Sequence, residues 1–186
     1  MFGRIGEVMK LLIGITSSIA AYRIPNLVSA LRKKDIEIKT IVTEKAKAFI
    51  APQALAVMSQ NPCYDDQAEW GNTEHVLHIE LAKWCDVFLI APLSANTLAK
   101  ITYGLCDNLL TSTVRALGEK PLLLAPAMNT RMWDNPLTIQ QLEMVKNFYN
   151  VKVIDPVAKR LADGDEGVGG LAEDETIIRE ILNLKK

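Results

Sequence analysis

Apolar residues in this chain fall into short continuous runs separated by longer amphipathic stretches. Continuous runs occupy residues 10–15, 86–92 and 120–126, and each has the length of a buried strand. Residues 36–42 and 151–155 mix apolar and polar positions and predict two further strands. Continuous apolar strands of this kind are typical of a mostly parallel sheet that is covered by helices on both faces.

Helical spacing predicts what lies between the strands. In the segment after residue 15, apolar residues recur with a helical period, and Pro25 indicates a kink or an irregular start. The dipeptide Asn135-Pro136 is typical of a helix cap followed by proline in the first turn. Further helices are predicted at residues 53–60, 74–85, 95–104, 107–117, 137–149 and 174–186. Residues 61–73 and the glycine-rich stretch 160–170 predict surface loops.

These elements predict a single α/β domain of three-layer α/β/α, Rossmann-like architecture over residues 10–184, with residues 1–9 as an N-terminal extension. A length of 186 residues suits one such domain. The formal net charge is −1, and Lys and Arg are spread along the chain, which argues against nucleic acid or an anionic membrane as a partner.

The cellular compartment of the protein is predicted from its apolar runs and its cysteines. No apolar run is long enough to span a bilayer, and no signal-peptide pattern follows the first ten residues. The three cysteines form no CxxC pattern and are odd in number. We therefore expect a cytoplasmic protein with reduced thiols.

Candidate chemistry gathers where the predicted strands end, because ligands of such folds bind at the carboxyl ends of the strands. The segment GITSSIA, which begins at Gly14, offers backbone N–H groups and hydroxyls at a helix start and can seat a phosphate. It lacks the GxGxxG dinucleotide pattern, and its Ser and Thr residues also suit simple helix capping.

Two further strand ends resemble each other. APLSANT and APAMNTRMW both follow a buried strand, begin Ala-Pro and place an asparagine close to the strand end. In one loop alone, Ser94 or Asn129 would be explained as a helix cap. Two such loops on adjacent strands favour a shared site for one planar polar ligand.

Histidine and the glycine-rich stretch complete the candidates. His75 and His78 are the two histidines of the chain, and an imidazole can act as a base near neutral pH, although a helical histidine is also often structural. The stretch RLADGDEGVGGLAE suits a lid or an ordinary surface loop. It fails the EF-hand pattern at Gly167 and Asp174, and we expect no metal.

Together, PLSANT, PAMNTRMW and VLHIEL resemble the homo-oligomeric flavin-containing cysteine decarboxylases, over nearly the whole chain. The segments GLCDNLLTSTVRA and KRLADGDEGVGGLAE are more similar to the phosphopantothenoylcysteine branch than to the peptide-modifying branch. The resemblance implies an FMN cofactor, a small-molecule substrate, and assembly into trimers or a dodecamer of trimers with the flavin at a subunit contact.

The resemblance also implies roles for individual residues. His78 matches the family's base, and Asn129 matches its ligand for the substrate carboxylate, with Met132 beside it. Arg160 and Ala162 belong to a clamp over the substrate. The residues implied to hold the FMN phosphate and ribityl chain are Gly14, Thr16, Ser17, Ser18 and Thr43. Those implied to line the flavin ring are Ser94, Ala95, Asn96, Thr97 and Ala127.

The implied reaction oxidises the cysteine-derived part of 4'-phospho-N-pantothenoylcysteine to a thioaldehyde, releases CO₂ and finally yields 4'-phosphopantetheine. The chain departs from the family at Asp163, where the clamp carries the cysteine that protonates the intermediate. Either Asp163 replaces that acid, or the reaction stops at an aminoenethiol, as it does for peptidyl-cysteine substrates. A non-catalytic flavin-binding regulatory subunit is the third alternative.

Overall fold

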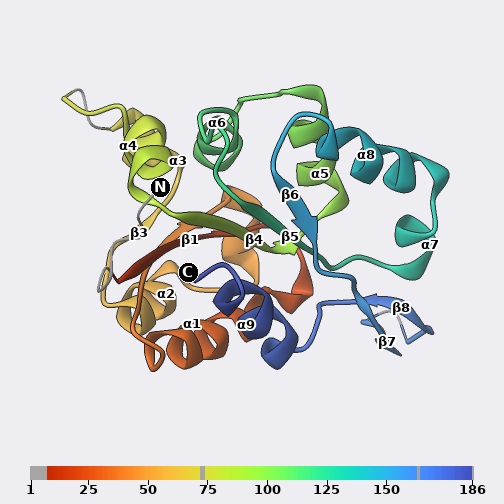
Figure 1. The fold of residues 1–186 in the computed structure, drawn as a ribbon. Coiled ribbons are helices and arrows are strands. Elements are labelled where there is room, and N and C mark those ends of the chain that lie inside the picture. The colour runs from red at the N-terminus through yellow and green to blue at the C-terminus, as the bar shows by residue number, and fades with distance from the viewer. Residues whose placement is uncertain (1–7, 72–73, 163, 186) are drawn as a thin grey trace.

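A parallel sheet forms the centre of the molecule in a computed structural model, which describes residues 8–71, 74–162 and 164–185. Its strand order is β3-β2-β1-β4-β5-β6, and every neighbouring pair is parallel. Figure 1 shows the sheet crossing the molecule between two layers of helices. The strands are β1 (Met9–Ile15), β2 (Ile36–Val42), β3 (Cys63–Tyr64), β4 (Val87–Leu93), β5 (Leu122–Pro126) and β6 (Val151–Val153).

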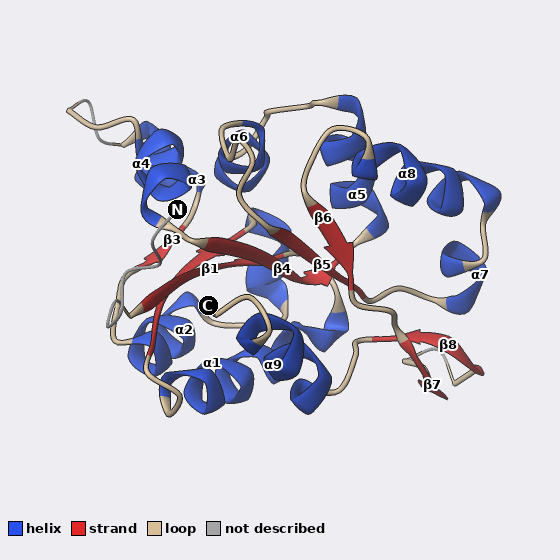
Figure 2. Cartoon of the chain, viewed as in Figure 1, coloured by secondary structure: helices blue, strands red, loops and turns tan. Residues whose placement is uncertain are grey.

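Helices cover both faces of this sheet. One layer consists of α1 (Ile24–Arg32), α2 (Pro52–Ser59) and α9 (Asp174–Leu182). The other layer consists of α3 (Asp66–Trp70), α4 (Leu77–Trp84), α5 (Ala95–Tyr103), α6 (Leu109–Arg115) and α8 (Pro136–Lys146). Figure 2 shows the two helical layers above and below the strands. The predicted three-layer α/β/α fold is confirmed. Within the described parts of the chain, no helix is both long and apolar enough to cross a membrane.

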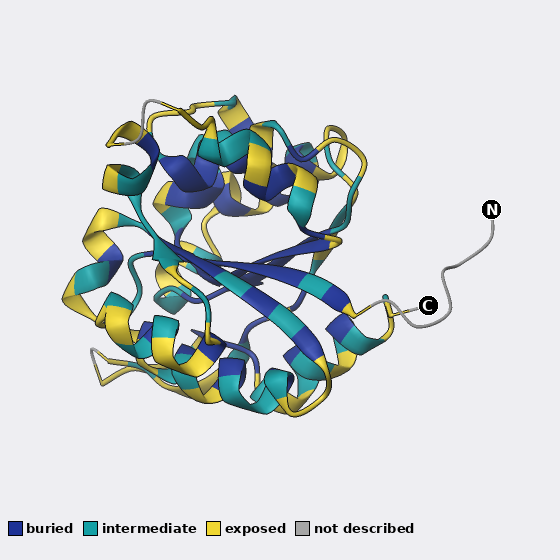
Figure 3. Cartoon of the chain, turned by 90° about the vertical axis from the view of Figure 1, so that its left-hand side faces the viewer, coloured by how far each residue is buried: buried dark blue, intermediate teal, exposed yellow. Residues whose placement is uncertain are grey.

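The core lies on both faces of the sheet, which explains why the strands read as continuous apolar runs. Successive β1 residues serve opposite faces: Leu11 and Ile13 pack with α1 and α9, whereas Leu12 packs with α4, α5 and α6. Phe88 of β4 is fully buried in the second cluster. Figure 3 shows the central strands as mostly buried and the outer sides of the helices as exposed.

The order of the strands places a crevice between β1 and β4. From β1 the chain builds outward to β2 and β3, then returns to the other side of β1 with β4, β5 and β6. The connections after β1 and β4 therefore leave the sheet in opposite directions, and the space between them is where ligands bind in open parallel sheets. The segments GITSSIA and APLSANT flank this point.

Two regions that the sequence predicted as loops contain regular structure. Residues 61–73 include β3 and α3, and α3 is capped by Asp65, whose side chain accepts the Ala68 N–H. A strand of two residues and a helix of five are too short to give a periodic signal. The first predicted helix does start irregularly, as the 3₁₀ helix η1 (Ile19–Arg23) that precedes α1.

The glycine-rich stretch is the second region. Arg160 and residues 166–170 belong to an antiparallel hairpin of β7 (Val157–Arg160) and β8 (Glu166–Gly170), so the prediction of a loop was wrong for these residues. A side chain at Gly169 would place its Cβ 2.1 Å from the carbonyl oxygen of Met128. Glycine, which usually weakens a strand, is required here because the hairpin packs directly on the backbone that follows β5.

Candidate functional site

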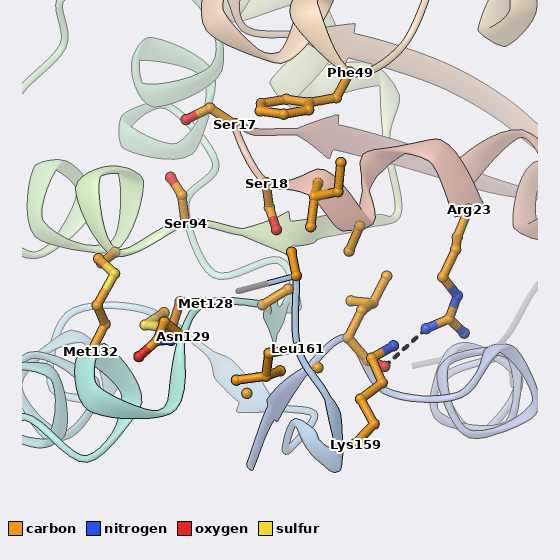
Figure 4. A pocket seen from close by; sticks show the side chains of 18 of the residues that line it. Ser17, Ser18, Arg23, Phe49, Ser94, Met128, Asn129, Met132, Lys159 and Leu161 are labelled. Atoms are coloured by element: carbon orange, nitrogen blue, oxygen red, sulfur yellow. Dashed lines mark hydrogen bonds between the residues drawn. The ribbon is translucent and has the colours of Figure 1, made fainter. Parts of the chain in front are cut away.

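A cavity of about 700 Å³ opens at the carboxyl ends of β1, β4 and β5, and the β7–β8 hairpin forms its remaining wall. Figure 4 shows the hydroxyls of Ser17, Ser18 and Ser94 on one side, with Asn129 and Leu161 on the other. The residues that line the cavity are Ser17, Ser18, Ile19, Ala20, Tyr22, Arg23, Phe49, Ser94, Ala95, Asn96, Ala127, Met128, Asn129, Met132, Lys159, Arg160, Leu161, Ala162, Gly169, Gly170 and Leu171.

Ser17 and Ser18 lie where the chain leaves β1 and enters η1. Ser18 occupies the cap position of η1 in an extended conformation, yet its side chain makes no capping hydrogen bond. The hydroxyl points into the cavity instead (Figure 4). Two serine hydroxyls beside the start of a helix form a suitable donor set for a phosphate.

Thr16 joins the exits of β1 and β4 from behind the cavity wall. Its side chain is fully buried; the hydroxyl donates to the Pro92 carbonyl at 2.7 Å and accepts the Ser94 N–H at 2.8 Å. Ser94 in turn accepts the Thr97 N–H at 3.2 Å and caps α5. Thr16 and Thr97 therefore hold Ser94 in place rather than line the cavity.

The loop after β5 forms the opposite wall. The Met128 N–H donates to the Gly169 carbonyl at 2.9 Å, which attaches this loop to the hairpin. Asn129 caps the short helix α7 (Thr130–Trp133), with its Oδ1 accepting the Arg131 N–H at 2.8 Å. Ser94 and Asn129 thus both act as helix caps and both line the cavity, so capping and a place in the site are compatible.

Most of the site residues predicted from the sequence are brought together in this cavity. Ten of them line it: Ser17, Ser18, Ser94, Ala95, Asn96, Ala127, Asn129, Met132, Arg160 and Ala162. Gly14 lies behind the wall, where a Cβ would come within 2.7 Å of Leu110 Cδ1. Thr43 also lies outside the lining, with its hydroxyl donating to the Ile15 carbonyl at 3.3 Å. Asp163 lies outside the described residues.

Several lining residues were missed by the sequence analysis. Arg23 and Phe49 come from segments that gave only helix or turn signals. The Arg23 guanidinium donates to the Leu171 carbonyl at 2.9 Å and to Asp174 at 2.7 Å, and so ties η1 to the start of α9 (Figure 4). Lys159 adds a second cation beside Arg160. No motif marked these residues, because they come from three segments that only the fold brings to one cavity.

His78 is located elsewhere. It lies in the first turn of α4 and is not among the described residues that line the cavity. Figure 1 shows α4 far across the molecule from β7 and β8. The side chain is 27% exposed, and Nδ1 lies 2.5 Å from Oε1 of Glu69. A single chain therefore does not bring the predicted base and the predicted substrate residues together.

The cysteines do not contribute a nucleophile to this cavity. Burial raises the pKa of Cys85 to about 11 and also raises the pKa of Cys63. A thiol that stays protonated is a poor nucleophile. Cys106 is exposed, and none of the three lines the cavity or forms a disulfide.

Comparison with known proteins decides the family. A family model described as Flavoprotein matches residues 5–186. The chain is a member of the flavoprotein family. The resemblance to flavin-containing cysteine decarboxylases is confirmed, because the chain is 46% identical over 178 residues to a phosphopantothenoylcysteine decarboxylase of Mus musculus, covering 92% of this chain and 85% of that protein.

Solved structures agree with this assignment. A mutant PPC decarboxylase in complex with pantothenoylaminoethenethiol superposes with a TM-score of 0.89 at 40% identity, covering 97% of this flavoprotein and 100% of that chain. The FMN binding protein AtHal3 gives a TM-score of 0.84 at 41% identity and covers 95% and 96% of the two chains. The first relative agrees with the reaction predicted from the sequence, and the second agrees with the predicted cofactor.

The cavity itself suits a flavin mononucleotide. Its volume of about 700 Å³ is in the range of small-molecule sites. The hydroxyls of Ser17 and Ser18 stand at the β1 end, where they can donate to a phosphate. Small side chains at Ala95 and Ala127 leave room for a planar ring, and the Asn96 amide in the same lining offers it both a donor and an acceptor.

Proposed function

We propose that this flavoprotein is an FMN-dependent decarboxylase that converts 4'-phospho-N-pantothenoylcysteine to 4'-phosphopantetheine. One observation carries the proposal: the polar exits of β4 and β5 meet the β7–β8 hairpin around one cavity, in a chain 46% identical to a phosphopantothenoylcysteine decarboxylase. The two loops that the sequence paired would hold cofactor and substrate side by side.

The cofactor would be held by the β1 and β4 exits. Ser17 and Ser18 would bind the phosphate, and residues 94–96 with Ala127 would line the ring. When bound, the flavin supplies an acceptor for the hydride of the thiol-bearing carbon, which makes loss of the neighbouring carboxylate favourable. The contribution of the chain is to orient the substrate, exclude water and transfer protons.

The substrate would lie between the β5 exit and the hairpin. The Asn129 amide, its plane fixed by the bond to the Arg131 N–H, would donate to the departing carboxylate. Met132 would offer apolar contact to the pantothenoyl chain, and Arg160 at the end of β7 and Ala162 just after it would close over that chain. The adjacent cation of Lys159 supports recognition of an anionic substrate.

His78 would deprotonate the substrate thiol, which requires a second copy of the chain. The histidine lies far from its own cavity, and large apolar side chains at the cavity mouth are exposed: Tyr22 is 63% and Met132 48% accessible. Together with Ile19, which is 53% accessible, they form an apolar rim around one cavity, and contiguous exposed apolar surface marks an interaction site. We propose a homo-oligomer, a trimer or a dodecamer of trimers, in which His78 of one copy reaches the cavity of another.

Asp163 would determine the final product. A carboxyl group could donate the proton that the family's clamp cysteine supplies, although an unperturbed aspartate is mostly ionised at neutral pH. A mutant relative holds pantothenoylaminoethenethiol, a decarboxylated enethiol. An enethiol product is therefore the second candidate, favoured by the residue at position 163.

The proposal is tested by mass spectrometry on purified holoprotein. We expect yellow protein with bound flavin that removes CO₂ alone from phosphopantothenoylcysteine. Loss of CO₂ and two hydrogens would identify the enethiol, and a preference for a peptide with a C-terminal cysteine would identify the peptidyl reaction. The His78→Asn variant should retain flavin and lose about 10²–10⁴-fold in turnover. Bound flavin with no turnover of either substrate would support the regulatory alternative.

We also propose a cytoplasmic location. All three cysteines are free thiols in the structure, and a reducing compartment keeps such thiols free. Tagged protein recovered with the cytoplasmic fraction would support this location, and recovery with secreted proteins would contradict it.

A further inference from the structure

Glu69 is a buried carboxylate whose two oxygens both face His78. Its side chain is 6% exposed. Oε2 accepts the His78 backbone N–H at 3.0 Å, and Oε1 lies 2.5 Å from the ring Nδ1. An acidic side chain is rarely buried unless it has specific partners, and both of these contacts of Glu69 are with the predicted base.

The helix that carries Glu69 is capped and is attached to the rest of the molecule at two points. Asp65 caps α3 through the Ala68 N–H and pairs with Lys47 at 2.7 Å. Asp66 accepts the Leu109 N–H at 2.8 Å and attaches α3 to the start of α6. Asp65 and Asp66 therefore anchor a short helix in such a way that Glu69 meets α4 at a fixed position.

The second histidine offers an internal comparison. His75 Nδ1 lies 2.9 Å from Glu80 Oε1, but both side chains are more than half exposed. Water competes for such a pair and leaves its geometry weakly determined. The same type of contact at His78 is shielded, because the carboxylate is buried and is also bonded to the histidine backbone.

We propose that Glu69 is the positioning residue that keeps His78 in the tautomer with a proton on Nδ1. A carboxylate only accepts hydrogen bonds, so the facing Nδ1 must carry the hydrogen. In the neutral ring, Nε2 then holds the lone pair and becomes the basic nitrogen. The bond from the His78 backbone N–H fixes the position of His78 against Glu69, and the contact at Nδ1 fixes the rotation of the imidazole ring. The catalytic consequence rests on the proposed function, in which Nε2 of His78 takes the thiol proton.

A Glu69→Gln variant distinguishes this role from simple packing. Glutamine has nearly the same shape but one acceptor oxygen and one amide donor. The His78 backbone N–H needs the oxygen, so the amide faces Nδ1 and favours the opposite tautomer, with the hydrogen on Nε2. The lone pair is then on Nδ1 and faces residue 69, and Nε2 carries a hydrogen and cannot accept the thiol proton of a substrate.

The tautomer is read from ¹⁵N spectra of histidine-labelled, substrate-free holoprotein at a pH where the ring is neutral, with His75→Gln used to assign the signals. We expect Nδ1–H in the wild type and Nε2–H in Glu69→Gln. A wild-type ring with hydrogen on Nε2 overturns the proposal. Should the glutamine variant not fold, Glu69→Asp, which keeps two acceptors, should retain Nδ1–H.

Kinetics give the second readout. Glu69→Gln should lower kcat by about 10²-fold or more with little change in KM, as loss of a tautomer-fixing carboxylate does elsewhere, and Glu69→Asp should restore part of it. Glu80→Gln is the matched control, because it removes the carboxylate that faces His75 and leaves the contacts between Glu69 and His78 in place. An equal loss of kcat in Glu80→Gln would show that the effect is not specific to the carboxylate facing His78, and would overturn the proposal.

The two readouts separate the positioning role from the reaction. If His78 carries its hydrogen on Nδ1 and the wild type decarboxylates neither substrate, the proposed function fails and the positioning of His78 by Glu69 stands. If decarboxylation is efficient and Glu69→Gln is fully active, the proposed function stands and the positioning of His78 by Glu69 fails.

Discussion

Individual side chains in this flavoprotein act in layers around the cavity. Ser94 and Asn129 line it, whereas Thr16 and Thr97 hold Ser94 from behind. Thr16 has a hydroxyl that is fully buried and used both as donor and as acceptor. Its side chain connects two strands 76 residues apart in the sequence, so its loss should affect the site without removing any lining group.

Thr16→Val tests this connection. Valine has nearly the same shape but leaves the buried Ser94 N–H without an acceptor, which should cost about 1–3 kcal/mol in free energy of unfolding. We expect the variant to bind flavin more weakly as well, because Ser94 loses its anchor. Urea unfolding and flavin titration of the apoprotein measure the two effects.

Thr113→Val is the matched control for that variant. Thr113 is equally buried, and its hydroxyl donates at 2.7 Å to the Leu109 carbonyl, which already accepts a bond within α6. Loss of the Thr113 hydroxyl should lower the free energy of unfolding by no more than about 1 kcal/mol and should leave the flavin affinity unchanged. Equal effects of both substitutions on flavin binding would contradict the role given to Thr16.

At the scale of elements, short segments with weak sequence signals determine the geometry of the site. The β7–β8 hairpin forms one wall of the cavity, and α3 places Glu69 against His78. Both segments are held by a few specific contacts rather than by a large apolar face. Gly169 against Met128 and Asp65 against Lys47 are examples. Such elements should respond to single substitutions more strongly than the central strands do.

The stability contributed by α3 should depend on pH through Asp65. Burial opposes ionisation of this carboxyl, but hydrogen bonds from Lys47 and the Ala68 N–H outweigh it and lower its pKa below 3.8. A carboxyl group whose pKa is lower in the folded state stabilises the protein fully at pH values above its unfolded-state pKa. This stabilisation is lost as the pH falls through the folded-state pKa. Asp65→Asn keeps a capping oxygen but removes the charge.

We therefore expect Asp65→Asn to be less stable than the wild type at pH 7. The difference in free energy of unfolding should shrink as pH falls below 3.8 and vanish below the folded pKa. Thermal unfolding of both proteins across this range measures it. A difference that stays constant with pH would show that the ion pair with Lys47 does not contribute.

At the scale of the whole molecule, the proposed active site is divided. The cavity lies at the carboxyl edge beside the hairpin, and His78 lies across the molecule on α4 (Figure 1). Such a division predicts that no isolated chain is active and that activity depends on the subunit contact. It also predicts that two inactive variants can repair each other.

Subunit complementation tests this arrangement. His78→Asn and Asn129→Ala should each be inactive alone. Mixed in equal amounts and reassembled, they should recover about one quarter of wild-type turnover, because that share of sites combines an intact cavity with an intact histidine from a neighbour. Mixing without reassembly is the control. No recovery in verified mixed oligomers would place both residues in one subunit's site.

The sequence alone was sufficient for the fold class and for most of the cavity. Continuous apolar runs reveal strands buried on both faces, and such strands leave one option, a parallel sheet with two helical layers. The carboxyl-end rule then placed the β4 and β5 exits together, and the structure does bring Ser94 and Asn129 to one cavity. Both steps depend on local pattern and on general topology.

Tertiary structure alone decided the remaining features. Periodicity reports which side of an element faces the core, but it carries no information about how two distant loops run past each other. The hairpin, which packs Gly169 on the Met128 carbonyl, and the short helix α3 gave no periodic signal. The pairing of Glu69 with His78, and the distance of His78 from its own cavity, follow from those paths, because each contact joins segments that only the folded backbone brings together.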